Sequence, residues 1–196
     1  MRCRDPAVSV AVRAYSHMKM VTYFGQIFWG LLVVILDFHF NRVDILPDFV
    51  GYVLIAIGCR GLVFASRHFS TASVMSWVLL ALNLLELAFR GDEALVFRWA
   101  SLVFDCAMMW FLLGGVMELA TARQRMDLSE SASKRRIAYV VLRSLLTLTG
   151  LVAEGSRGAV TVIAVSGLVC MLLLLFLILH LIHRAKSELT HDRAVS

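Results

Sequence analysis

The chain has 196 residues, of which 60% are hydrophobic and only 17% are charged, and its mean hydropathy is +0.79. A soluble domain carries roughly 45–50% apolar and about 25% charged residues, so this composition excludes an ordinary water-soluble domain. The formal charge of +5 comes from basic residues in short segments between apolar runs. That placement is typical of membrane orientation and argues against a nucleic-acid partner.

Six apolar runs approach the roughly 20 residues that cross the hydrocarbon core of a bilayer. The sequence therefore predicts an all-α, polytopic membrane protein whose six transmembrane helices form three antiparallel hairpins. A cytoplasmic N-terminal segment (1–20) precedes a transmembrane domain (21–183), and a cytoplasmic tail (184–196) follows it. The expected helices cover residues 21–38, 47–65, 71–90, 94–122, 137–153 and 159–182. Within the first segment, residues 7–20 are expected to lie as a short helix on the membrane surface.

The turn between the first two expected helices reads NRVDILPDFVGY. Pro47 suits the first turn of a helix, where its missing N–H has no partner to lose. Asp44 is placed to cap that start, and Asp48 adds negative charge near the positive end of the helix dipole. Gly51 and Gly58 are seven residues apart and share a helix face, which favours close approach of another helix. The pattern indicates a well-capped, tight hairpin.

The string D-I-L-P-D-F-V-G-Y, at residues 44–52, resembles a turn in uncharacterised small six-helix bacterial membrane proteins. Those proteins read D-I-L-P-D-F-I-G-Y before a glycine-bearing apolar helix. The shorter pattern D-x-x-P-D-F is similar to a motif in another small bacterial family. The resemblance implies a bacterial cytoplasmic (inner) membrane protein and attaches no activity to these residues.

The charges of the loops predict the orientation of the chain. The N-terminal segment, the end of the second expected helix, the polar linker 121–136 and the C-terminal tail are basic. The alternate turns, at residues 39–48, 90–98 and 154–158, are near neutral and hold most of the loop acids. Because short loops set orientation through their Lys and Arg residues, both termini are expected in the cytoplasm.

One candidate site is the outer rim, where acidic residues gather around the turns. Its main members are Asp37, Asp44, Asp48, Glu86 and Arg90. Such a cluster would bind a hard cation or relay protons, although helix capping and solvated ion pairs explain the same residues. Because no EF-hand or zinc spacing is present, we expect no metal and no cofactor.

A second candidate site is buried charge. Asp105 is expected near mid-membrane and Arg143 lies in the fifth apolar run. Ionisable side chains there cost several kcal/mol, about 2.5–3.5 on insertion scales, unless they are paired or hydrated. Either the two form a salt bridge that locks the bundle, or Asp105 lines a transport pathway with Glu86 and Asp37.

Enzyme signatures are absent, since the sequence holds no HExxH, GxSxG, P-loop or GxGxxG pattern. We therefore expect a non-enzymatic membrane protein that acts through a membrane protein partner or as a homo-oligomer. The alternative is a small secondary transporter or ion-coupled carrier that uses intramembrane carboxylates.

Overall fold

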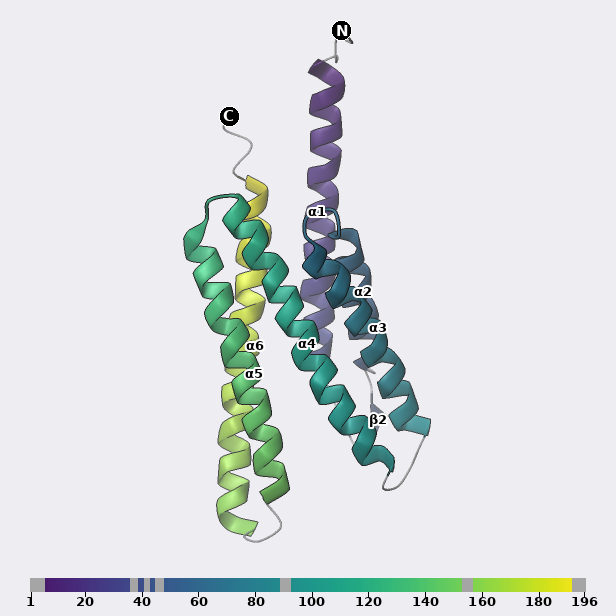
Figure 1. The fold of residues 1–196 in the computed structure, drawn as a ribbon, viewed down its shortest axis with the longest axis vertical. Helices are drawn as coiled ribbons and strands as arrows, with labels where there is room; N and C mark the ends of the chain where they lie inside the picture. Colours follow the sequence, from purple (N-terminus) through teal and green to yellow (C-terminus); the bar gives the residue numbers. More distant parts are fainter. Residues whose placement is uncertain are drawn as a thin grey trace.

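The computed structural model describes residues 6–35, 39–40, 43–44, 48–88, 93–152 and 157–191. Within these residues the chain forms six helices, which confirms the all-α prediction (Figure 1). They are α1 (Pro6–Ile35), α2 (Asp48–Gly61), α3 (Arg67–Ala88), α4 (Glu93–Ala122), α5 (Met126–Val152) and α6 (Arg157–His191). Between α1 and α2, β1 (His39–Phe40) and β2 (Val43–Asp44) form a small antiparallel ladder with His39 opposite Asp44.

Each helix packs against the next one in the chain, and α6 also packs against α1. The start of α1 and the end of α6 lie at the same end of the molecule (Figure 1). The short connections at residues 62–66 and 123–125 also lie toward this end, which we call the terminal end (Figure 1). The helices therefore alternate in direction along the chain.

The core is a seam of apolar side chains that runs between the helices. Its largest fully buried members include Phe24 of α1, Phe69 of α3 and Leu112 of α4. The rings of Phe24 and Phe69 meet edge to face, with centroids 6.3 Å apart, an arrangement that aromatic pairs prefer. Each helix buries only one face in this seam, so its opposite face lies on the outer surface of the molecule.

Glycines bring α1 and α2 into backbone contact. A Cβ atom built on Gly51 would lie 2.8 Å from the carbonyl oxygen of Gly30, and one on Gly30 would lie 2.7 Å from the carbonyl oxygen of Gly51. A Cβ atom on Gly58 would lie 2.8 Å from the carbonyl oxygen of Tyr23. The face shared by Gly51 and Gly58 is thus the surface on which α1 rests, as small-residue helix packing requires.

The first helix differs from the expected one. The structure has one continuous helix from Pro6 to Ile35, where the sequence predicted a separate surface helix over 7–20 and a span from residue 21. Proline is favourable in a first helical turn, and no further proline or glycine interrupts the chain before Gly25. The change from polar to apolar composition therefore marks no break in the backbone.

The polar linker expected over residues 121–136 is also mostly helical. Only residues 123–125 lie outside helices, because α5 begins at Met126. Lys134 and Glu130 form an i,i+4 ion pair at 2.8 Å, which supports a helix, and Leu128 and Ala132 are buried. Similarly, α6 extends to His191 instead of ending near 182, whereas α2 ends at Gly61 instead of 65.

Two helices are long and apolar enough to cross a membrane, judged by length and composition within the described residues. These segments are Arg67–Leu85 and Trp99–Ala122. Three shorter apolar stretches lie at Met20–Val34, Phe49–Gly61 and Val169–Ala185. Six transmembrane helices therefore stay a prediction.

Candidate functional site

The strongest candidate site lies between α4 and α5. Asp105 lies on the buried face of α4, which it shares with Met108, Met109 and Leu112 at helical spacing. On α5, Tyr139 and Arg143 are four residues apart and therefore share a face. Packing of α4 against α5 brings the three polar side chains together.

One carboxylate oxygen is the centre of this arrangement. The Tyr139 hydroxyl donates a hydrogen bond of 2.6 Å to Asp105 Oδ2, and Arg143 Nε lies 3.3 Å from the same oxygen. Asp105 is 7% exposed, whereas the side chain of Arg143 is 42% exposed. We call these three residues the Asp105 clamp.

The clamp joins the two residues that the sequence singled out as buried charge, Asp105 and Arg143. Tyr139 was missed, because a tyrosine in an apolar run resembles an ordinary core residue. Its position four residues before Arg143 was the available signal, since residues at this spacing lie together on a helix. Chemically, the clamp balances a buried carboxylate with one positive charge and one hydroxyl donor.

No known protein family, characterised protein or solved structure matches the chain. Function must therefore be inferred from the packing, the polar contacts and the surface of the chain itself.

A second polar cluster connects the start of α3 to the end of α4. Ser66 precedes α3, and its hydroxyl oxygen accepts a hydrogen bond of 3.1 Å from the backbone N–H of His68, as a helix N-cap does. The same hydroxyl donates to the carboxylate of Glu118. His68 Nε2 lies 4.0 Å from Glu118, and its ring stacks on Phe111 with centroids 6.0 Å apart. These contacts fix how the α2–α3 connection lies on α4.

Arg136 of α5 covers the neighbouring part of α4. Its guanidinium carbon lies 3.5 Å from the ring centroid of Trp110, which is a cation–π contact. Its Nη1 atom is also the nearest neighbour, at 3.3 Å, of a Cβ atom built on Gly114. Although the sequence placed Arg136 only in a basic linker, the structure uses it to pack α5 on α4.

The outer-rim hypothesis falls largely outside what the structure describes. Asp44 lies in β2, Asp48 begins α2 and Glu86 lies in α3, but their side chains are outside the described set. Asp37, Pro47 and Arg90 are outside the described residues. A cation site at the rim therefore stays a prediction, as does the capping role of Asp44.

Asp127 joins the terminal ends of α5 and α6. Its carboxylate accepts from Arg184 Nη2 at 2.9 Å and from Arg125 Nε at 3.4 Å. The hydrogen bond from Arg125, then that from the backbone N–H of Leu128, and then the charges of Arg125 and Arg184, hold the pKa of Asp127 below its usual range. A lowered pKa in the folded state means that the contact stabilises at pH values above about 3.9 and is lost as the pH falls through the lowered pKa.

We therefore expect acid to loosen the end of α6. Between pH 7 and pH 2, amide hydrogen exchange around Arg184 should accelerate in the wild type, after correction for the intrinsic pH dependence of exchange. In Asp127→Asn the fast exchange should already be present at pH 7, because the charge is gone. An unchanged rate in that variant at pH 7 would contradict the role given to Asp127.

Proposed function

We propose that the chain is an integral membrane protein of the bacterial cytoplasmic membrane, with all six helices in the bilayer and both termini in the cytoplasm. The observation that carries this proposal is the apolar outer surface. Large hydrophobic side chains are exposed on every one of the six helices. They include Trp29, Ile57, Trp77, Val103, Val141 and Phe176, with exposures between 43% and 67%.

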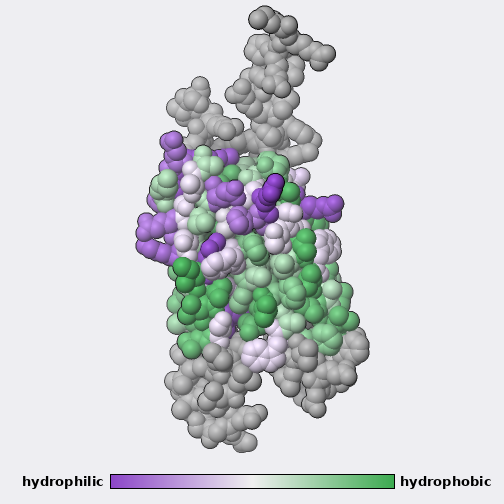
Figure 2. Space-filling model, in the orientation of Figure 1, coloured by the Kyte–Doolittle hydropathy of each residue, from purple (hydrophilic) through white to green (hydrophobic). Residues whose placement is uncertain are grey.

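Such a surface is not expected in water. The largest contiguous apolar patch on a soluble monomer is about 300–600 Å², and exposed apolar area costs about 25 cal/mol per Å² relative to burial. Figure 2 shows hydrophobic side chains grouped together over the middle of the molecule, with hydrophilic side chains gathered toward the terminal end. Lipid tails covering the apolar region, with headgroups at the polar end, account for both features.

The orientation follows from the same polar end. The 123–136 segment and the end of α6 lie there (Figure 1), and both segments are rich in basic residues. Since Lys and Arg in short loops are retained in the cytoplasm, this end is proposed as cytoplasmic. In the sequence, the stretches between α1 and α2, between α3 and α4, and between α5 and α6 are less basic.

We further propose that the protein is non-enzymatic and acts through a membrane protein partner or as a homo-oligomer. Support comes from the Asp105 clamp, in which the most deeply buried acid of the described residues is already bound by a hydroxyl donor and a guanidinium. An acid that carries cargo has to exchange its partners during each cycle, whereas one that locks two helices keeps them. The clamp favours the locking role over the carrier alternative.

Cysteine accessibility tests the topology. In a cysteine-free background, Asp44→Cys and Glu130→Cys should react with a membrane-impermeant maleimide from opposite sides of the membrane. Intact cells should label only the residue-44 position, and inverted vesicles only the residue-130 position. Labelling of both from one side would contradict the six-helix topology.

Flux measurements separate the locking role from transport. We expect the purified protein in liposomes to leave an imposed pH or sodium gradient unchanged, with Asp105→Asn behaving like the wild type. Dissipation of either gradient by the wild type, abolished in a folded Asp105→Asn variant, would instead establish the carrier function.

A further inference from the structure

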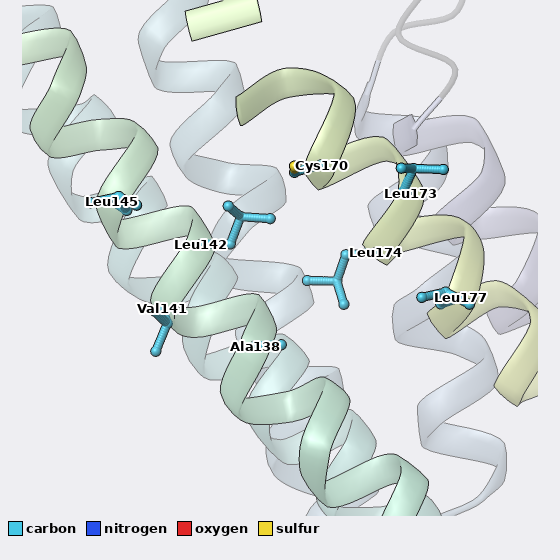
Figure 3. Close-up of a pocket in the computed structure, with 8 residues that line it drawn as sticks. All are labelled: Ala138, Val141, Leu142, Leu145, Cys170, Leu173, Leu174 and Leu177. Carbon is cyan, nitrogen blue, oxygen red and sulfur yellow. The ribbon is translucent and has the colours of Figure 1, made fainter. Parts of the chain in front are cut away.

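An apolar groove runs between α5 and α6 on the outer surface. Figure 3 shows the eight residues that line it. They are Ala138, Val141, Leu142 and Leu145 from α5, and Cys170, Leu173, Leu174 and Leu177 from α6. The groove has a volume of about 450 Å³, and several of its side chains, including Val141 and Leu173 at 60% exposure, are open to the outside.

The end of the groove nearest the terminal end is marked by an arginine. Arg135 precedes the lining residue Ala138 by three positions, which is about 4.5 Å along the helix. Its Nη1 donates a hydrogen bond to the carbonyl oxygen of Leu177, the lining residue of α6 nearest to the terminal end. The guanidinium of Arg135 therefore bridges the two helices at the mouth of the groove.

The described acids near this mouth are paired with cations other than Arg135. Asp127 is shared between Arg125 and Arg184, and Glu130 is paired with Lys134. Among the described residues Arg135 forms no ion pair with a carboxylate. Burial, and then the nearby charge of Arg184, lower the pKa of Arg135. Its charge is thus one that an added anion would stabilise.

We propose that the groove binds an acyl chain of an anionic phospholipid, whose headgroup phosphate contacts Arg135 at the mouth. The proposal rests on the membrane location proposed above. A guanidinium is well suited to phosphate oxygens, and basic sites between helices on the cytoplasmic side are suited to anionic headgroups. A second copy in the same orientation would instead bring its own basic residues to this level, so charge complementarity favours lipid over a homo-oligomer contact.

Native mass spectrometry of the full chain released from micelles tests whether Arg135 binds the lipid headgroup. With equal amounts of phosphatidylglycerol and phosphatidylcholine present, we expect retention of phosphatidylglycerol. Arg135→Gln should reduce that retention by about fivefold, the effect of one basic residue near an anionic surface. Lys134→Gln removes the same charge from a side chain that is 74% exposed and paired with Glu130, and should change retention by less than about twofold.

A second pair of variants tests whether the groove itself binds the acyl chain. Ala138→Phe fills the groove without altering charge and should reduce phosphatidylglycerol retention as much as Arg135→Gln does. Ile137→Phe enlarges an exposed neighbour that does not line the groove and should retain the lipid. Equal retention by all four variants, or equal losses in Arg135→Gln and Lys134→Gln, would overturn the proposal.

Three further outcomes are distinguishable. If the wild-type chain is extracted from membranes by alkaline carbonate, the proposed membrane location itself fails. If the chain resists extraction but shows no preference for phosphatidylglycerol, only the lipid site fails. A protein dimer that Ala138→Phe converts to monomer, with no retained lipid, would assign the groove to a second copy and overturn the lipid proposal.

Discussion

Replacing Arg143 with methionine is expected to destabilise the folded bundle by about 3–5 kcal/mol, because it leaves a buried carboxylate without its counter-charge. Asp105 is only 7% exposed, so water cannot take the place of the guanidinium. The measurement is the free energy of unfolding in mixed micelles, followed by circular dichroism during titration with a denaturing detergent.

The reciprocal change should cost less. Asp105→Leu removes the carboxylate that faces Arg143, but the Arg143 side chain is 42% exposed and its long stem can extend toward polar surroundings. We expect a loss of about 1–3 kcal/mol, the cost of leaving polar partners unsatisfied. Tyr139→Phe removes only the hydroxyl donor and should cost about 0.6 kcal/mol, the average for a side-chain hydrogen bond between helices in a membrane.

A double variant tests whether Asp105 and Arg143 act as one buried pair. If the two form one buried pair, Asp105→Leu combined with Arg143→Met should recover much of the loss, because replacing both partners of a buried pair by apolar residues is often neutral or stabilising. Additive losses in the double variant would show that the pair is not coupled. Lys134→Met, which breaks an exposed ion pair, provides the control and should cost at most about 0.5 kcal/mol.

The buried acid of this clamp could be found from the sequence because it is an exception to its surroundings. Asp105 lies in an apolar run with no turn or helix end nearby to explain it, and few cations in the other runs could balance it. Arg143 was therefore identifiable as a partner. Tyr139 was not, because the same residue type occurs at ordinary core positions, and only the fold shows that its hydroxyl faces α4.

Helix bounds were less predictable than helix content, because composition and backbone conformation change at different places. Hydropathy marks where a helix enters lipid, whereas capping, glycine and proline determine where it ends. The polar residues of 126–136 continue α5, and those of 6–20 belong to α1. The Ser66–Glu118 contact joins residues 52 positions apart, and neither residue shows a local pattern that predicts the other.

Close packing of α1 on α2 was accessible from the sequence because it depends on one residue type at a regular spacing. Gly51 and Gly58 predicted a smooth face, but their spacing cannot identify the partner helix. The structure supplies that partner, and it adds Gly30, which contacts Gly51 reciprocally. The energetic importance of this contact can be measured at a single position.

Gly51→Leu is expected to lower the free energy of unfolding by about 3 kcal/mol, at the upper end of the range for overpacking. A Cβ atom there would meet Val34 Cγ2 at 2.5 Å and the Gly30 carbonyl oxygen at 2.8 Å, and the oxygen belongs to the backbone. It cannot rotate away as a side chain can, so α1 and α2 have to separate. Gly51→Ala should also destabilise, although alanine alone would favour the helix by about 1 kcal/mol.

Gly114→Ala is the matched control for the alanine change. Gly114 is also a buried glycine within a helix, but the nearest atom to an added Cβ is Arg136 Nη1 at 3.3 Å, at the far end of a flexible side chain. Arg136 can shift by a few tenths of an ångström, so the gain in helix propensity should leave stability unchanged or raised by up to about 1 kcal/mol. If Gly51→Ala and Gly114→Ala had the same effect on the free energy of unfolding, backbone contact between α1 and α2 would not be what requires glycine at position 51.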